Sequence, residues 1–143
     1  MSYAVDTNIW ARSLHRNHPM QQPAKDAIKF ILSSGETIYL LPQNLYELWV
    51  VLTRRIEENG FGLSSVDVRK QLEDLEELFT LKADSDATYT EWKNLVEQNS
   101  VKGKVGHDAR IVAAMNVHGI TNLLTLNPKD FKRFQGVTVV TPE

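Results

Sequence analysis

The chain has 143 residues, of which 42% are hydrophobic and 24% are charged, and it contains no cysteine. This is the composition of a globular protein, and no apolar run approaches the roughly 20 residues of a membrane-spanning helix. The 16 basic and 18 acidic residues give a net charge of −2, which excludes a globally basic nucleic-acid-binding protein. Without cysteine, any metal must be bound by oxygen or imidazole ligands.

The length and the first residues set two further expectations. A chain of 143 residues predicts a single domain over residues 1–143. The first residues carry neither the basic segment nor the apolar stretch of a signal peptide, and we therefore expect a cytoplasmic protein without a membrane partner.

The first half of the chain predicts two strands, each followed by a helix. Residues 3–5 are β-prone and end at Asp6, which suits a helix N-cap. Apolar residues at helical spacing predict a helix over residues 21–34, closed by a glycine. Residues 38–41 predict a buried strand, and Pro42 begins the next helix. The inward stripe of that helix is expected to be Leu45, Leu48, Trp49, Leu52 and Ile56.

The second half continues this alternation of helices and strands. Ser64 and Asp67 have the spacing of a capping box and predict a helix with Val68, Leu72, Leu75 and Phe79 inward. Further helices are predicted over residues 86–99 and from His107 to Gly119, and strands over residues 122–125 and 137–140. Strands separated by helices predict an α/β fold with a parallel sheet flanked by helices on both faces.

Acidic side chains follow the predicted strands. They are Asp6, Glu47 and Asp130, and Asp108 begins the helix before the third strand. Taken singly, each has a structural explanation as an N-cap, a solvated helix charge or a turn residue. Together they converge at the carboxyl ends of the strands, where unscreened carboxylates would repel one another. An all-oxygen set favours Mg²⁺ or Mn²⁺ over Zn²⁺, and such ions suit phosphate chemistry.

Four ordered blocks of this sequence resemble the PIN domain ribonucleases, which include the VapC-type toxins of bacterial toxin–antitoxin pairs. The blocks are Val5-Asp6-Thr7-Asn8, Asn44-Leu45-Tyr46-Glu47-Leu48-Trp49, Gly106-His107-Asp108-Ala109-Arg110-Ile111-Val112-Ala113-Ala114 and Leu124-Thr125-Leu126-Asn127-Pro128-Lys129-Asp130-Phe131.

The resemblance spans nearly the whole chain and carries specific expectations. It implies a three-layer α/β/α fold and a metal-dependent endoribonuclease that acts on RNA. It further implies that Asp6, Glu47 and Asp108 are the acidic ligands of Mg²⁺ or Mn²⁺, with Thr125 and a nearby acid in support. A homodimer and, for a toxin, an antitoxin partner are also implied.

The last block departs from the family pattern. The family often has Thr-x-Asp-x-Asp-Phe, whereas the stretch from Thr125 to Phe131 is one residue longer and has Asn127 in place of the first acid. Pro128 pushes Asn127 toward extended geometry near the cleft, while Asp130 follows in the turn. Either residue can fill the fourth ligand position of the site, beside Asp6, Glu47 and Asp108. We favour Asp130 as a water-mediated acid, with Asn127 orienting a bound water.

Basic residues flank the predicted site. Residues 101–110 and residues 129–133 each have a net charge of +2, and Arg12 follows the first acid. We call these basic residues the basic rim; they are Lys102, Lys104, Arg110, Lys129, Lys132, Arg133 and Arg12. The rim would attract RNA phosphates, although an ordinary solvated surface has the same composition. His107 can donate to a phosphate, but we favour a helix-start role for it. Core packing is favoured over base stacking for Trp10, Trp49 and Trp92, and Trp10 is the most open of the three.

Three functions are compatible with this pattern. The first is a metal-dependent endoribonuclease, as the toxin of a toxin–antitoxin pair. The second is a catalytically weak RNA-binding or scaffold protein on the same fold, because Asn127 replaces an acid. The third, an aspartyl-phosphate domain, is disfavoured because Asp6 is the only acid directly after the first strand. Metal-dependent cleavage of RNA separates the first two.

Overall fold

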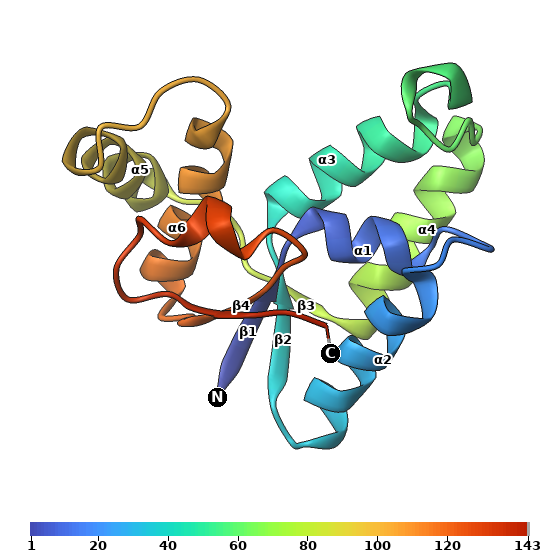
Figure 1. Cartoon of the computed structure of the whole chain (residues 1–143), viewed down its shortest axis with the longest axis horizontal. Helices are drawn as coiled ribbons and strands as arrows, with labels where there is room; N and C mark the ends of the chain where they lie inside the picture. The colour runs from blue at the N-terminus through green and yellow to red at the C-terminus, as the bar shows by residue number, and fades with distance from the viewer. Residues whose placement is uncertain (143) are drawn as a thin grey trace.

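The computed structural model describes residues 1–142 and is built around a sheet of five parallel strands in the order β3-β2-β1-β4-β5 (Figure 1). The strands are β1 Ser2–Val5, β2 Thr37–Leu40, β3 Thr80–Leu81, β4 Asn122–Leu124 and β5 Thr138–Val140. The helices are α1 Thr7–Ser13, α2 Gln21–Ser33, α3 Pro42–Thr53, α4 Ser65–Leu78, α5 Asp86–Gln98 and α6 Val105–His118, with 3-10 turns η1 Ile56–Glu58 and η2 Pro128–Phe131. The predicted α/β fold with a parallel sheet is confirmed.

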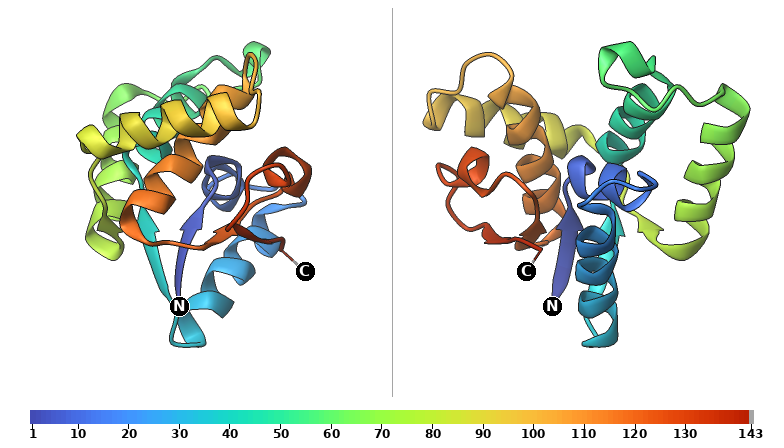
Figure 2. Two further views of the ribbon diagram at one scale, coloured as in Figure 1. Left: turned by 90° about the vertical axis from the view of Figure 1, so that its left-hand side faces the viewer. Right: turned by 45° about the vertical axis from the view of Figure 1, so that its right-hand side comes forward.

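Helices cover both faces of the sheet. Successive strand residues point to opposite faces, so neighbouring residues of one strand pack against different helices. Val5 and Leu124 pack against α1 to α4, whereas their neighbours Ala4 and Leu123 pack against α5, α6 and the segment around Phe131. Figures 1 and 2 show α1 to α4 gathered on one side of the sheet and α5 and α6 on the other. The three-layer α/β/α arrangement is therefore confirmed.

Local sequence signals account for most element boundaries. Asp6 caps α1, Pro42 is the first residue of α3, and the Ser64 hydroxyl accepts a hydrogen bond from the backbone N–H of Asp67 at the start of α4. Strand β3 was not predicted, because it has two residues and directly follows the apolar periodicity of α4. Helix α6 begins two residues before His107.

The end of α3 differs from the prediction. The helix ends at Thr53, so Ile56 lies outside it and is 71% exposed, and Trp49 is 38% exposed. The expected inward positions of these two residues were therefore wrong. The chain folds back after the helix, where Phe61 and Leu63 donate backbone hydrogen bonds to the end of α3 and pack against the core in their place.

The other two tryptophans are placed as expected. Trp10 is 2% exposed and packs edge-on against Phe79, with 5.0 Å between ring centroids. Trp92 is half-buried, and its indole N–H donates to the carbonyl of Gly106 at 2.8 Å. The Trp10 ring is therefore not available to stack on a base, because it is enclosed, and Trp92 supports the start of α6.

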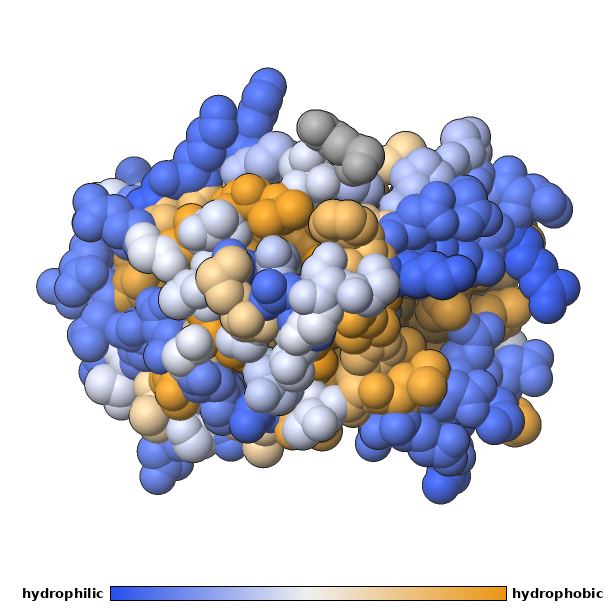
Figure 3. All heavy atoms as spheres, turned by 90° about the horizontal axis from the view of Figure 1, so that it is seen from below, coloured by the Kyte–Doolittle hydropathy of each residue, from blue (hydrophilic) through white to orange (hydrophobic). Residues whose placement is uncertain are grey.

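The amino ends of the strands form the face opposite the predicted site. Figure 3 shows this face, on which apolar residues gather near the centre and hydrophilic residues lie at the left and right margins. Within residues 1–142, no helix combines the length and the apolar character that crossing a membrane requires.

The carboxyl ends of β1 and β4 lie side by side at the point where the strand order reverses. The backbone N–H of Asp6 donates to the carbonyl of Leu124 at 2.8 Å, and that of Thr125 donates to Val140 at 2.9 Å. Ligands of open α/β sheets bind beyond this switch point. Asp6 and Thr125, which follow β1 and β4, therefore stand where a site is expected.

Candidate active site

Asp6 is fixed by hydrogen bonds to both oxygens of its carboxylate. As the N-cap of α1, it accepts the backbone N–H of Thr7 at Oδ1, at 2.8 Å. Its Oδ2 accepts the hydroxyl of Thr125 at 2.7 Å. Asp6 is only 9% exposed and Thr125 is fully buried, so the carboxylate is held in one orientation at the floor of the site.

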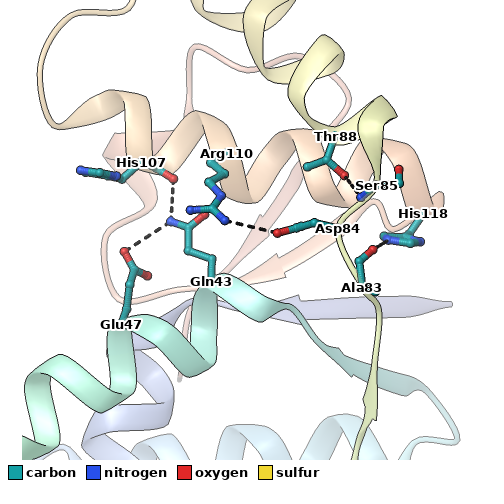
Figure 4. A network of polar contacts seen from close by, with 9 residues as sticks. All are labelled: Gln43, Glu47, Ala83, Asp84, Ser85, Thr88, His107, Arg110 and His118. Carbon is teal, nitrogen blue, oxygen red and sulfur yellow. Dashed lines mark hydrogen bonds and ion pairs between the residues drawn. The ribbon is translucent and has the colours of Figure 1, made fainter.

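Glu47 lies one turn into α3 and is held by one residue of α1 and one residue of its own helix. The Thr7 hydroxyl of α1 donates to Glu47 Oε1 at 2.7 Å. Gln43, one turn earlier on α3, donates from Nε2 to Glu47 Oε2 at 3.3 Å and to the carbonyl of His107 at 2.8 Å. Figure 4 shows Gln43 between the carboxylate of Glu47 and the first turn of α6. These contacts orient Glu47 relative to both strands of the switch point.

Asn44 connects the start of α3 to the end of β1. It is fully buried, and its amide donates to the carbonyl of Val5 at 2.9 Å and to the Thr7 hydroxyl at 3.3 Å. Its side-chain oxygen accepts the backbone N–H of Leu41 at 3.0 Å. The Thr7 hydroxyl thus accepts from the Asn44 amide and donates its own proton to the carboxylate of Glu47, whose oxygen is the acceptor.

The predicted acids line one pocket at the carboxyl ends of the strands, which we call the acidic pocket. Its lining residues are Asp6, Thr7, Asn8, Ala11, Gln43, Tyr46, Glu47, Val50, Val51, Arg54, His107, Asp108, Arg110, Asn127 and Asp130. The structure therefore brings together every predicted site residue except Thr125, which lies beneath Asp6 and holds it.

The carboxylates of the acidic pocket interact electrostatically. The pKa of Asp6 is raised to about 6, chiefly by burial; the charges of Glu47 and Asp130 contribute to the increase, and the hydrogen bonds from Thr125 and Thr7 oppose it. The pKa of Asp108 is raised to about 7 by burial, which is the largest cause, together with the charges of Asp6, Asp130 and Glu47. Clustered carboxylates with raised pKa values are typical of functional sites.

Comparison with protein families decides the identity of the fold. The family model for the PIN domain matches residues 3–137. The chain belongs to the PIN domain family. No curated protein matches its sequence.

Solved structures of bacterial toxin–antitoxin proteins share this fold. One is VapBC2 from Rickettsia felis bound to a promoter DNA fragment, with 16% identity, a TM-score of 0.73 and full coverage of both chains. FitAcB from Neisseria gonorrhoeae has 16% identity and a TM-score of 0.67 over 98% of this chain and 97% of its own. VapC20 of Mycobacterium tuberculosis, a sarcin–ricin loop cleaving toxin, has 22% identity and a TM-score of 0.60 over 85% and 86%.

Asn127 and Asp130 both lie at the acidic pocket of this PIN domain. Asn127 precedes η2, and its backbone N–H donates to the Thr125 hydroxyl at 3.0 Å. Asp130 lies within η2, and its charge raises the pKa of Asp108 more than the charge of Glu47 does. Asp130 therefore contributes negative charge near Asp108. Which of Asn127 and Asp130 serves a metal stays a prediction.

The donor chemistry of the pocket fits a hard divalent cation, but the ligands are not yet gathered around one point. Within residues 1–142, no three acidic, imidazole or thiol groups are arranged closely enough to form a ready metal site. The charge of Asp6 nevertheless disfavours the charged form of Asp108, which a cation between the two carboxylates would relieve. Oxygen ligands of this kind suit Mg²⁺ and Mn²⁺.

The predicted basic rim is only partly at this pocket. Arg110 lines it and pairs with Asp84 at 3.2 Å (Figure 4). Its guanidinium also lies over the Tyr46 ring. Arg133 is close enough to lower the pKa of Asp108. The four lysines of the rim are exposed on the surrounding surface, and Arg12 lines a neighbouring pocket.

Sequence reasoning missed the residues that orient the acids. Thr7 directly follows Asp6, and Gln43 precedes Glu47 by one helical turn, so both spacings were visible in the sequence. Arg54 was also missed, because its position at the pocket depends on the fold-back after α3. No short-range pattern encodes that fold-back.

Proposed function

We propose that this PIN domain is a VapC-type endoribonuclease that hydrolyses RNA phosphodiester bonds with Mg²⁺ or Mn²⁺. The observation that carries the proposal is the acidic pocket, in which Asp6, Glu47, Asp108 and Asp130 share one recess at the switch point of the sheet. The similar fold of VapC20, a toxin that cleaves the sarcin–ricin loop, supports RNA as the substrate class.

The four acids are proposed to hold the metal, with Asp130 acting through water. When bound, Mg²⁺ or Mn²⁺ polarises a phosphate oxygen and lowers the pKa of a bound water. The remaining residues position these acids. Thr125 holds the carboxylate of Asp6, and Thr7 and Gln43 hold that of Glu47. These neutral donors orient the carboxylates without cancelling the negative charge that attracts a cation.

A catalytically weak RNA-binding or scaffold protein is the alternative. Two observations favour it: Asn127 stands where the family often has an acid, and no three potential ligand groups within residues 1–142 are gathered for a metal. Under this alternative the pocket binds RNA or a partner without turnover. The two proposals differ in whether a divalent metal supports strand cleavage.

The decisive experiment is metal-dependent cleavage of defined RNAs. The purified protein is incubated with a sarcin–ricin loop fragment, a transfer RNA and an unstructured RNA, in Mg²⁺, in Mn²⁺ and in EDTA. We expect discrete cleavage products with either metal and none in EDTA. Intact RNA in all three solutions, together with measurable RNA binding, would contradict the nuclease proposal and support the binding protein.

An antitoxin partner and a homodimer belong to the same proposal. The similar structures from Rickettsia felis and Haemophilus influenzae are VapBC assemblies, which supports an antitoxin for this chain, acting with it in the cytoplasm. Exposed apolar residues on α3, including Trp49 and Val50, give a surface that an assembly can cover. Sedimentation equilibrium of the purified chain tests the dimer, and inhibition of cleavage by the product of an adjacent small gene tests the antitoxin.

A further inference from the structure

A second pocket adjoins the acidic pocket and has the opposite character; we call it the basic pocket. It is lined by Asn8, Ala11, Arg12, His15, His18, Val51, Arg54, Ile56, Asn59, Gly60 and Phe61. Four of these residues, Asn8, Ala11, Val51 and Arg54, also line the acidic pocket, so the two recesses are continuous. Within residues 1–142, no carboxylate lines the basic pocket.

The two arginines of the basic pocket have no acidic partner among the described residues. Among residues 1–142, neither Arg12 nor Arg54 forms an ion pair with a carboxylate, whereas the neighbouring Arg55 pairs with Glu58. The Nε of Arg54 is buried and has no hydrogen-bond partner, although its Nη2 donates to the carbonyl of Asn59 at 3.3 Å. A buried donor without a partner is costly, and an anion in the pocket would satisfy it.

The two histidines add further donors to the same pocket. His15 Nδ1 lies 3.0 Å from a guanidinium nitrogen of Arg12, and His18 Nδ1 accepts the backbone N–H of Met20 at 3.0 Å. Both partners can only donate, so Nδ1 is the acceptor in each ring and Nε2 carries the proton. Neither Nε2–H has a partner within residues 1–142. The rings stack at 4.8 Å between centroids, which holds both donors in place.

The fold-back after α3 shapes one wall of the basic pocket. Phe61 packs against the His15 ring at 4.3 Å between centroids, and its backbone N–H bonds to the carbonyl of Val51. Gly60 lies so close to the Arg54 backbone that any Cβ there would clash with the Arg54 carbonyl. The glycine therefore permits the tight turn that brings Arg54 and Phe61 into the pocket.

We propose that the basic pocket binds a phosphate group of the RNA chain, next to the phosphodiester that occupies the acidic pocket. This inference rests on the proposed function, because it places a second phosphate of the same substrate. A single-stranded RNA carries a charge on every nucleotide, and the acidic pocket alone would repel it before a metal is bound. Guanidinium groups suit phosphate oxygens, which accept their hydrogen bonds in pairs.

The continuity of the two pockets favours RNA over an acidic protein segment. An acidic peptide would be attracted to the basic pocket but repelled by the four carboxylates beside it. An RNA backbone needs both environments at neighbouring positions, with metal and acids at the bond that is cut and cations at the next phosphate. The acidic peptide is therefore an outcome that the experiment separates from RNA.

The test measures the affinity for a fluorescently labelled single-stranded RNA of about ten nucleotides. Fluorescence anisotropy reports the binding, and EDTA is present so that no cleavage occurs. The variants are Arg12→Gln, Arg54→Gln and the double variant. Arg55→Gln is the matched control, because Arg55 adjoins Arg54 but is 73% exposed and paired with Glu58. Circular dichroism melts establish that each variant folds, and Arg12→Gln keeps the test open if Arg54→Gln does not fold.

We expect the double variant to bind RNA about tenfold more weakly or worse, and the slope of log K against log salt to fall by about 0.7 per lost phosphate contact. The Arg55→Gln variant should match the wild type in both measurements. Unchanged affinity and slope in the double variant would overturn the inference, as would an equal loss in Arg55→Gln. The same variants are also tested with a labelled polyglutamate peptide, which represents an acidic protein segment. A double variant that loses binding to this peptide but still binds RNA as the wild type does would also overturn the inference.

Failure of this inference can be told apart from failure of the proposed function. If the wild type cleaves RNA with Mg²⁺ and the double variant still binds RNA normally, only the basic pocket assignment is overturned. If the double variant loses RNA affinity and the wild type cleaves nothing with either metal, the phosphate site stands and the nuclease proposal fails.

Discussion

The Thr125 hydroxyl donates a hydrogen bond to Oδ2 of Asp6 at 2.7 Å across 119 residues of sequence. The contact joins the carboxyl ends of β1 and β4, the two strands between which the strand order reverses. The same hydroxyl oxygen accepts the backbone N–H of Asn127 at 3.0 Å. One buried side chain thus sets both the orientation of the first acid and the path of the segment that carries Asp130.

Replacing Thr125 by valine should weaken both the fold and the site. Thr125→Val keeps the shape of the side chain but leaves Asp6 Oδ2 and the Asn127 N–H without this partner, which costs about 1–3 kcal/mol. Because the hydroxyl lowers the pKa of Asp6, the pKa should rise further in the variant. Urea unfolding and carboxyl NMR titration measure the two effects. The exposed Thr138→Val is the control, and an Asp6 pKa that stays the same or falls would contradict the contact's role.

Replacing Asp6 by asparagine should stabilise the metal-free protein, and only above acidic pH. The pKa of Asp6 is about 6 in the folded chain against an ordinary value of 3.8, so the folded state binds more protons between these values. The wild type therefore loses stability as pH rises from about 4 to 6, by about 3 kcal/mol. Asparagine still caps α1 and removes this loss.

The stability difference is measured by urea unfolding in EDTA at about pH 4 and about pH 7.5. We expect Asp6→Asn to exceed the wild type at the higher pH and to approach it at the lower pH. The exposed Asp26→Asn on α2 controls for a general charge effect. A difference between Asp6→Asn and the wild type that does not vary with pH would show that Asp6 titrates normally in the folded chain.

Asn127→Asp and Asp130→Asn should shift the metal requirement in opposite directions. Asn127→Asp adds a carboxylate at the acidic pocket and should lower the Mg²⁺ concentration for half-maximal cleavage. Asp130→Asn removes a charge that raises the pKa of Asp108, so that pKa should fall. The pocket also loses a carboxylate that attracts the cation, so the Mg²⁺ concentration for half-maximal cleavage should rise. Mg²⁺ titration of the cleavage rate tests both. An unchanged requirement in Asp130→Asn would assign Asp130 to the structure of η2.

Gly60→Ala should disturb the fold-back after α3. The added Cβ would clash with the Arg54 carbonyl, and the turn must shift at a cost of roughly 1–3 kcal/mol. Gly106→Ala is the matched control for stability, because its Cβ would meet only Trp92 Cζ2 at an ordinary 3.9 Å. Thermal melts compare the two variants. A Gly60→Ala protein as stable as Gly106→Ala would show that the turn adapts without strain.

The fold and the positions of the acids could be predicted because both depend on local patterns. Asp6 follows a short apolar strand and Glu47 lies one turn into the helix after the next strand, and parallel topology then places both at one sheet edge. Asp108 and Asp130 are also anchored to helix or turn starts beside the same edge. Periodicity and topology were sufficient for these residues.

The features that sequence reasoning missed depend on contacts between distant segments. The exposure of Ile56 and the inward placement of Arg54 both follow from Phe61 and Leu63 bonding back to α3. These backbone hydrogen bonds depend on tertiary packing. The helical period of the sequence, which predicted an inward Ile56, carries no information about them. Gln43 likewise gains its role only when the His107 carbonyl of α6 lies beside α3.

We propose the acidic pocket as the catalytic centre of an RNA-cleaving enzyme. Its most direct test is the single-turnover rate of cleavage of one defined RNA in Mg²⁺ by the wild type, Asp6→Asn and the control Asp26→Asn. We predict that Asp6→Asn lowers the rate by about 100-fold or more while remaining folded, and that Asp26→Asn cleaves as the wild type does. Cleavage by Asp6→Asn at the wild-type rate would contradict the claim.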